Sequence, residues 1–554
     1  MLILINNICA KTTSDINGGK NISDYFSGLI SLNDKSYEDS FRFFRQLEGL
    51  ENYHPNYSKS YIHSLINLGR INEALRYSKS LEKKNINNYE SNLIIGVYNI
   101  KNKNYEKAKK YFDRIIDKNK RNVMHQFLAS QLNTWLVIEN SNYEKTSKVF
   151  ENKNNQYNNL NKIQNAFLNC YYDTKKAENF FSNLVNDNNT DFSRYHFFYA
   201  NYLIQKGEKS KAKKIVNEAL EKYPENLILK QFKKDISSNF AINIKNKFDC
   251  KNLSNIVGEL FYISSNALSS RFIYDESNFY LNLAKYLNPN FISYEVLQAE
   301  NLYLSGNLED AKKIYKKIGS FGEVYSWHAS KQTVKILIRQ KKDIQALKLF
   351  ENAYNKKVSP DIYETFDYAF FLKNNEKYEE AVTYYSSILQ QIDDKHPLYH
   401  QATDGRGISF ERLGKWKMAE KDFLDSLDSK PDQAYVLNYL AYSWIERGIN
   451  INESLKMLER ANEIKKNDGY IIDSLGWAYF KLENIENAKK YLQLAVMLMP
   501  RDPIVNDHFA DALWLSGKKI QARYYWKYVL GLQDTTDELK SKINEKLING
   551  LKKL

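Results

Sequence analysis

Proline, glycine and cysteine are scarce in this chain of 554 residues. Eight Pro and 20 Gly leave little room for long linkers or for the many turns of a β architecture. Hydrophobic residues make up 43% of the chain and aromatic residues 14%, which is enough apolar surface to bury a core and excludes a disordered chain. Helix is therefore the expected structure.

Neither the cysteines nor the apolar runs point to a special site. Cys9, Cys170 and Cys250 are far apart and form no CxxC pair, so metal and redox motifs lack support. Such a sparse, odd set fits the cytoplasm and the periplasm equally well. No run approaches the ~18 apolar residues that a membrane-spanning helix needs, and we predict no membrane span.

The N-terminus reads MLILINNICA followed by the polar KTTSDINGGK. This resembles the end of a secretory signal whose basic first part lies further upstream; the alternative is a frayed first segment of a cytosolic protein. The residues before Cys9, Asn6-Asn7-Ile8, do not form a lipobox. We predict a signal remnant or disordered N-terminus over residues 1–20 and a periplasmic or envelope-associated location, with a cytoplasmic one as the alternative.

The chain carries an excess of positive charge, +14 from 80 Lys and Arg against 66 Asp and Glu. The excess is mainly Lys, and the basic run 101–110 is interrupted by Glu106. A protein that reads bases more often uses Arg, which contacts guanine in a bidentate manner. A solvated basic surface is therefore favoured, and nucleic acid is disfavoured as a partner.

A repeat is clearest in residues 469–500. When Gly469 is counted as position 1, its characteristic residues are Leu475, Gly476, Tyr479, Ala488, Leu492, Ala495 and Pro500. This spacing is typical of the tetratricopeptide repeat (TPR), a helical hairpin of about 34 residues. Small residues at Gly476 and Ala488 let the two helices approach closely, while Pro500 ends the second helix because it has no N–H group.

Similar units recur along the chain. Strong copies begin at Ser193, His400, Ala434 and Pro503, and weaker copies centre on Ala74, Ala108, Ala177, Ser277, Ala311, Ala346 and Ala381. Roughly fourteen units predict an all-α TPR superhelical solenoid, in which each unit packs on its neighbours. We expect an N-terminal array over 21–235, a degenerate junction over 236–257, a C-terminal array over 258–534 and a capping helix over 535–554. The predicted buried face of the cap contains Leu539, Ile543, Leu547 and Leu551.

The sequence also carries a closer resemblance. The tail DSLGWAYFKLENIENAKKYLQLAVMLMP, the start SDYFSGLISLNDKSYEDSFRFF and the middle VGELFYISSNAL resemble large alphaproteobacterial TPR proteins. That resemblance implies export and no established catalytic role. More distantly, the tail is similar to TPR lipoproteins that dock periplasmic proteases or peptidoglycan enzymes. This chain departs from them in lacking a lipobox, which puts a lipid anchor in doubt.

No pattern supports catalysis, a cofactor or a metal. His396 and His400 are four residues apart, but the intervening Pro397 indicates a helix start and not a shared helix face. His508 lies among acidic residues that suit the positive end of a helix. We therefore predict no catalytic, cofactor-binding or metal-binding residues.

Protein binding is the better-supported function. In this repeat, positions 2, 5, 9 and 12 of the first helix line the concave face, and we predict partner contacts there at Tyr435, Asn438, Tyr442, Tyr470, Asp473, Trp477, Asp507 and Asp511. Aromatic residues among carboxylates suit a partly apolar, basic peptide or helix. In the alternative interpretation, the aromatic rings pack against neighbouring helices and the carboxylates are solvated.

The sequence thus predicts a non-catalytic scaffold or adaptor in cell-envelope assembly or proteolysis. Its partners would be other proteins, among them envelope enzymes or proteases. The alternative is a cytosolic TPR module in regulation or complex assembly.

Overall fold

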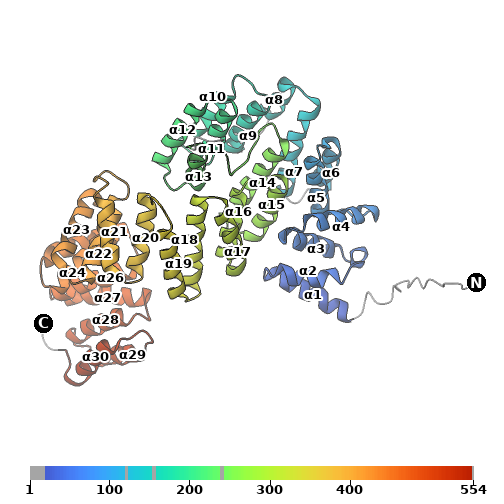
Figure 1. The fold of residues 1–554 in the computed structure, drawn as a ribbon. Helices are drawn as coiled ribbons and strands as arrows, with labels where there is room; N and C mark the ends of the chain where they lie inside the picture. The colour runs from blue at the N-terminus through green and yellow to red at the C-terminus, as the bar shows by residue number, and fades with distance from the viewer. Residues whose placement is uncertain (1–18, 119–122, 152–156, 238–242, 552–554) are drawn as a thin grey trace, which may run out of the picture. The chain divides into compact units, whose positions relative to one another are not determined.

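The computed structural model describes residues 19–118, 123–151, 157–237 and 243–551. Every regular element in these ranges is a helix, and most helices pair with the next one as an antiparallel hairpin (Figure 1). The predicted all-α repeat fold is confirmed. Most of the predicted signal remnant, residues 1–18, lies outside the described residues.

The structure divides into two compact units, residues 1–353 and 354–554. The helices of the first unit are α1 (Gly19–Asn33), α2 (Tyr37–Arg45), α3 (Pro55–Asn67), α4 (Ile71–Lys83), α5 (Tyr89–Lys101), α6 (Tyr105–Lys118), α7 (Val123–Leu136), α8 (Tyr143–Glu151), α9 (Asn158–Tyr171), α10 (Ala177–Val185), α11 (Tyr195–Gln205), α12 (Lys209–Lys222), α13 (Leu227–Ser237), α14 (Leu253–Ser269), α15 (Tyr274–Leu287), α16 (Ser293–Leu304), α17 (Leu308–Ile318), α18 (Glu323–Arg339) and α19 (Asp343–Asn355). Short 3₁₀ turns lie at Leu50–Asn52, Val137–Asn140 and Gly319–Phe321.

The second unit is a run of helical hairpins with one extra helix at its end. Its helices are α20 (Ile362–Asn374), α21 (Tyr378–Leu389), α22 (Tyr399–Arg412), α23 (Trp416–Ser429), α24 (Ala434–Glu446), α25 (Ile451–Ile464), α26 (Gly469–Lys481), α27 (Ile485–Leu498), α28 (Pro503–Leu515), α29 (Lys519–Leu530) and α30 (Asp537–Asn549).

The hairpin α26–α27 shows why the repeat needs small residues. A Cβ atom added to Gly476 would lie 2.7 Å from the Leu492 side chain, so only glycine lets the two helices approach this closely. Ala488 is fully buried in the same seam. The repeat register predicted for this unit is therefore confirmed at its closest point.

The capping helix was also predictable. Helix α30 buries Leu539 and Ile543, and Leu547 and Leu551 are partly buried beside the last hairpin. These four residues are the predicted apolar face, and burying them covers the end of the repeat core.

The first unit contains contacts that neighbour-to-neighbour stacking does not predict. Helices α3 and α5 pack against α15, which follows them by more than 170 residues (Figure 1). The Tyr37 hydroxyl donates to Asp275 over 2.8 Å, and the hydroxyls of Tyr89 and Tyr280 lie 2.9 Å apart. Helices α2, α3 and α5 thus contact the middle repeats of the same unit.

The predicted junction, 236–257, lies inside this first unit. Its described part from residue 243 to α14 is packed into the core, with Asn246, Phe248 and Cys250 buried. The Asn246 amide donates to the Tyr325 hydroxyl over 2.6 Å. Cys250 forms a disulfide with Cys170 of α9, and their Cα atoms are 6.0 Å apart. Sequence reasoning missed this pair, because the two cysteines are 80 residues apart and share no motif.

Candidate partner-binding surface

The eight predicted partner-binding residues lie on the first helices of three successive hairpins, α24, α26 and α28. Their exposure differs sharply. Tyr435 and Tyr470 are 56% and 60% exposed. Asn438 and Tyr442 are half-buried, and the other four are buried: Asp473, Trp477, Asp507 and Asp511.

The two exposed tyrosines occupy the same position in consecutive repeats, at the start of α24 and α26. The Tyr435 hydroxyl donates to Asp468 over 3.0 Å, and the Lys465 ammonium lies 4.0 Å from the centre of the Tyr435 ring. Asp468 also caps α26, where its carboxylate accepts from the backbone N–H of Tyr470. The Tyr435 ring is thus held by Asp468 and Lys465, Tyr470 begins a capped helix, and both tyrosines are more than half exposed.

Asp473 is bound by the chain itself. Its carboxylate lies 2.9 Å from Nδ1 of His508, and the His508 ring stacks on Trp477 with 3.9 Å between centres. Burial lowers the pKa of His508, but the charge and hydrogen bond of Asp473 outweigh it, so the net pKa is raised. This favours an imidazolium paired with the carboxylate.

Asp507 and Asp511 are likewise bound within the chain. The Lys546 ammonium of α30 lies 2.8–2.9 Å from oxygens of both carboxylates, and the Trp526 indole N–H donates to Asp511 over 3.0 Å. Burial and the neighbouring Asp507 charge raise the pKa of Asp511 to about 6, although Lys546 opposes this shift. These acids hold the capping helix in place.

The remaining two residues of this surface are half-buried, and Asn438 keeps unused hydrogen-bonding capacity. The side-chain oxygen of Asn438 is buried, and no donor contacts it in the described part of the chain. Burial raises the pKa of Tyr442, as do the charges of Glu446 and Asp473, so its hydroxyl stays protonated. Whether any of the eight residues contacts a partner stays a prediction.

Sequence reasoning missed Asp404 of α22. It occupies position 5 of its repeat, the position that Asn438, Asp473 and Asp507 hold in the next three. Burial raises the pKa of Asp404 to about 6, and Lys373 partly opposes this. The repeat register could have identified it, because an acid at this position recurs.

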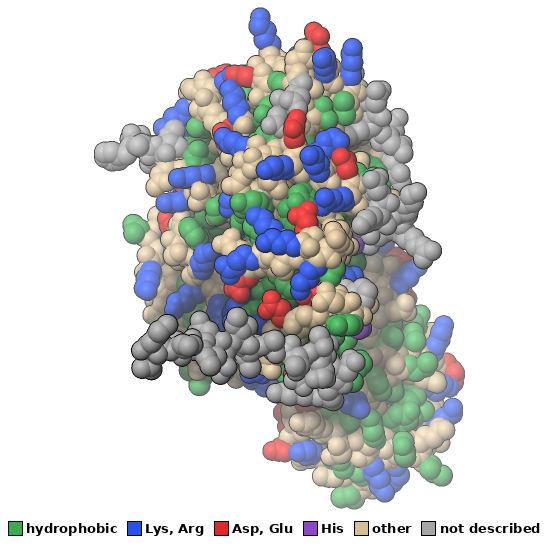
Figure 2. All heavy atoms as spheres, turned by 90° about the vertical axis from the view of Figure 1, so that its right-hand side faces the viewer, with side chains coloured by type: hydrophobic (Ala, Val, Ile, Leu, Met, Phe, Trp, Pro, Cys, Tyr) green, Lys and Arg blue, Asp and Glu red, His purple; other side chains and the backbone are tan. Residues whose placement is uncertain are grey.

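Among the described residues, neither metal-ligating side chains nor surface charge indicate a further functional site. No group of three or more His, Cys, Asp or Glu side chains in those ranges could hold a metal ion. No described helix has both the length and the apolar character needed to cross a membrane. Figure 2 shows Lys and Arg side chains spread over one face among acidic and uncharged ones, as a solvated basic surface requires.

Known proteins that are similar in sequence to this chain contain the same kind of repeat. Residues 324–535 match the family model described as tetratricopeptide repeat. A TPR repeat-containing protein of Pseudomonas aeruginosa PAO1 is 28% identical over 130 residues, which are 23% of this chain and 21% of that protein. This chain therefore matches only about a fifth of the length of that relative.

Similar solved structures share low sequence identity with this chain. A tetratricopeptide repeat protein from Parabacteroides merdae has a TM-score of 0.33 and 18% identity, over 40% of this chain and 86% of that one. The Cut9–Hcn1 hetero-tetramer of the APC/C has a TM-score of 0.38 and 13% identity, over 98% of this chain and 99% of that one. The match with the tetratricopeptide-repeat family thus covers residues 324–535, and proteins with this repeat generally serve as scaffolds for protein–protein interaction.

Proposed function

We propose that the protein is a non-catalytic scaffold of the cell envelope that holds a partly apolar, basic segment of a partner protein on its second unit. The observation that carries this proposal is the pair of exposed rings, Tyr435 and Tyr470, at one repeat position. Envelope enzymes and proteases are the partners we expect.

The chemistry of the surface sets the kind of partner. Tyrosine rings supply large contact area at a low entropic cost and are enriched where binding energy is concentrated. Neither Tyr435 nor Tyr470 fills the seam of its hairpin, since both are exposed. The acceptors beside them, Asp468 and the free oxygen of Asn438, suit the N–H groups of Lys, Arg or a peptide backbone.

The disulfide supports the envelope location. Disulfides persist in the periplasm and other oxidising compartments and are rare in the cytosol of mesophiles. Cys170 and Cys250 are both buried, and their bond fixes the packed segment 243–252 to α9. A cytosolic TPR module in regulation or assembly is the alternative, and it would keep both thiols reduced.

The test is a crosslinking pulldown from native cells with the double variant Tyr435→Ala, Tyr470→Ala. The control variant is Ile520→Ala, Tyr524→Ala, which removes two side chains of α29 that are 87% and 68% exposed. Envelope proteins that are lost only with the tyrosine variant would support the proposal. Identical partners with both variants, or cytosolic partners alone, would contradict it.

A further inference from the structure

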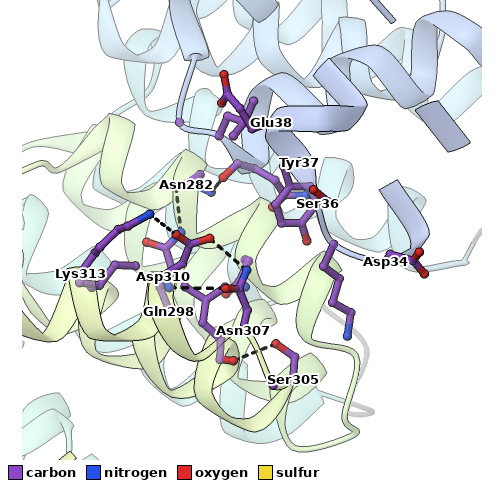
Figure 3. Close-up of a pocket in the computed structure, with 18 of the residues that line it drawn as sticks. Asp34, Ser36, Tyr37, Glu38, Asn282, Gln298, Ser305, Asn307, Asp310 and Lys313 are labelled. Atoms are coloured by element: carbon purple, nitrogen blue, oxygen red, sulfur yellow. Dashed lines mark hydrogen bonds and ion pairs between the residues drawn. The ribbon is translucent and has the colours of Figure 1, made fainter. Parts of the chain in front are cut away.

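A hollow of about 810 Å³, lined mostly by polar and charged side chains, lies in the first unit, whereas the surface described above belongs to the second unit. It is formed where the start of α2 and the end of α3 face α15, α16 and α17 (Figure 3). The volume falls within the ~300–1,000 Å³ range of ligand sites. Because distant parts of the chain build the hollow, no repeat motif marks it.

Carboxamides dominate one wall of the hollow. Asn278 and Asn282 lie one turn apart on α15, Gln298 follows on α16, and Asn67 faces them from the end of α3. The Gln298 amide donates to the Asn282 side-chain oxygen over 3.2 Å. The Asn282 amide reaches the Asn67 backbone oxygen only over 3.4 Å, which is a long hydrogen bond.

Part of this hydrogen-bonding capacity is unused. The side-chain oxygen of Asn67 is buried and has no donor in the described part of the chain. Asn278 is 4% exposed, and its oxygen accepts from Asn301 over 2.9 Å. One buried acceptor, the side-chain oxygen of Asn67, is thus left for a ligand, and leaving such a group unpaired is costly.

Most of the charged side chains that line the hollow already have an oppositely charged partner. Lys313 lies 2.8 Å from Asp310, whose other oxygen accepts from the Asn307 amide over 3.0 Å. Figure 3 shows these three side chains lying together beside Gln298 and Asn282. Glu38 is paired with Arg70 over 3.1 Å. A strongly charged ligand would therefore have to break existing ion pairs.

We infer that the hollow binds an extended polypeptide segment through its main chain. A peptide group carries one donor and one acceptor side by side, as a carboxamide does, so the two pair reciprocally. The segment would be polar and close to neutral, because the surrounding charges are balanced. This binding site is distinct from the one under the proposed function, which lies on the second unit.

Other ligand classes fit less well. Sugars are usually held against an exposed aromatic face, and Tyr37, the one aromatic side chain that lines the described hollow, is buried with its hydroxyl bound to Asp275. Lipids need a mainly apolar lining, whereas Leu68, Leu302 and Ile314 are the aliphatic side chains among the described residues that line this hollow.

A bulky side chain at Ser305 tests the inference. Ser305 lines the hollow at the end of α16, in ordinary helical backbone before Gly306. Ser305→Trp should fill the hollow without disturbing the hairpin. Ser516→Trp is the matched control, because Ser516 ends α28 in the same way before Gly517 and its hydroxyl likewise bonds the carbonyl three residues back.

The probe is a phage library of random dodecapeptides, selected on the full chain and counter-selected on Ser305→Trp. The selected peptides are then synthesised, and their binding is measured by fluorescence polarisation. We expect them to bind Ser305→Trp at least about tenfold more weakly, the equivalent of one or two lost hydrogen bonds. They should bind Ser516→Trp and the Tyr435→Ala, Tyr470→Ala variant as tightly as the wild type.

A separate measurement tests whether the hollow recognises the main chain of the peptide. N-methylation of single peptide bonds should weaken binding more than alanine replacement of the same residues, because it removes the backbone donor. The inference is overturned if no peptide distinguishes the wild type from Ser305→Trp while both chains are folded by circular dichroism. Selected peptides that tolerate N-methylation throughout and depend on a charged side chain would also overturn it.

Discussion

At the residue scale, the buried acids among the predicted partner-binding residues each form an ion pair within the chain. Asp473 pairs with His508, and Asp507 and Asp511 share Lys546. A buried carboxylate left without its partner costs several kcal/mol. These residues therefore act first on stability, and substitutions there would confuse a loss of folding with a loss of binding.

His508 makes the stability of the second unit depend on pH. Its pKa is raised in the folded state, so its contribution is fully present below the unfolded pKa of about 6.5 and is lost as pH rises through the folded pKa. Asp511 acts in the same direction. Its pKa is raised to about 6 in the folded chain, so stability falls as the pH rises above the pKa that Asp has in the unfolded chain. We expect His508→Gln to destabilise the chain by about 3 kcal/mol at pH 5.5.

The effect should be clearly smaller at pH 8.5. Urea unfolding followed by tryptophan fluorescence gives the free energy of unfolding of both chains at each pH. An equal difference between wild type and variant at the two pH values would contradict the assigned charge state of His508.

At the element scale, the sequence predicts the hairpins well, because helix spacing and turn residues are local. Gly517, between α28 and α29, has a φ of 80°, which favours glycine. Glu483 takes the same left-handed conformation between α26 and α27, with a φ of 57°. Glycine is thus a preference at this turn and not a requirement, because the clearest repeat, residues 469–500, has glutamate there.

Two glycine substitutions test how strongly this turn prefers glycine. Gly517→Ala should destabilise the second unit by about 1–2 kcal/mol, because a Cβ atom is strained at positive φ. Gly531→Ala is the control: Gly531 has helical backbone with a φ of −91°, and alanine there should be neutral or slightly stabilising. The turn account fails if thermal unfolding shows equal melting temperatures for the two variants.

Helix α30 offers a second test of an element. Lys546→Ala removes the cation from two buried carboxylates and should cost about 3–5 kcal/mol. Lys540→Ala, on the same helix, removes only an exposed ion pair with Asp537 and should cost less than about 1 kcal/mol. Hydrogen exchange of α30 in the two variants would reveal whether Lys546 holds the cap, and equal exchange would show that it does not.

At the scale of the whole molecule, sequence reasoning succeeded where contacts are between neighbours and failed where they are distant. The register of Gly476 and the apolar face of α30 follow from spacing alone. The packing of α3 on α15 and the Cys170–Cys250 bond join segments that no repeat period relates. Sequence reasoning also did not foresee that Tyr435 is exposed while Asp473 is buried. The environment of Asp473 depends on its contact with His508, which belongs to the next repeat.

The disulfide should be a major support of the first unit. It closes a loop of 80 residues, and restricting the unfolded chain over that length stabilises the fold by about 4 kcal/mol. We expect Cys250→Ser to lose this amount in urea unfolding without reductant. Dithiothreitol should lower the stability of the wild type but not of the variant, and equal stabilities without reductant would show that the bond does not form.

The most direct test of the scaffold account is site-specific photocrosslinking in native cells. A photoreactive phenylalanine derivative is placed at Tyr435 in one strain and at Tyr524, an exposed residue of α29, in another. We predict that position 435 yields a discrete crosslinked envelope protein, joined through a basic segment, and that position 524 does not. Crosslinks of equal yield to the same proteins from both positions, or none from position 435, would contradict the claim that this face binds a partner.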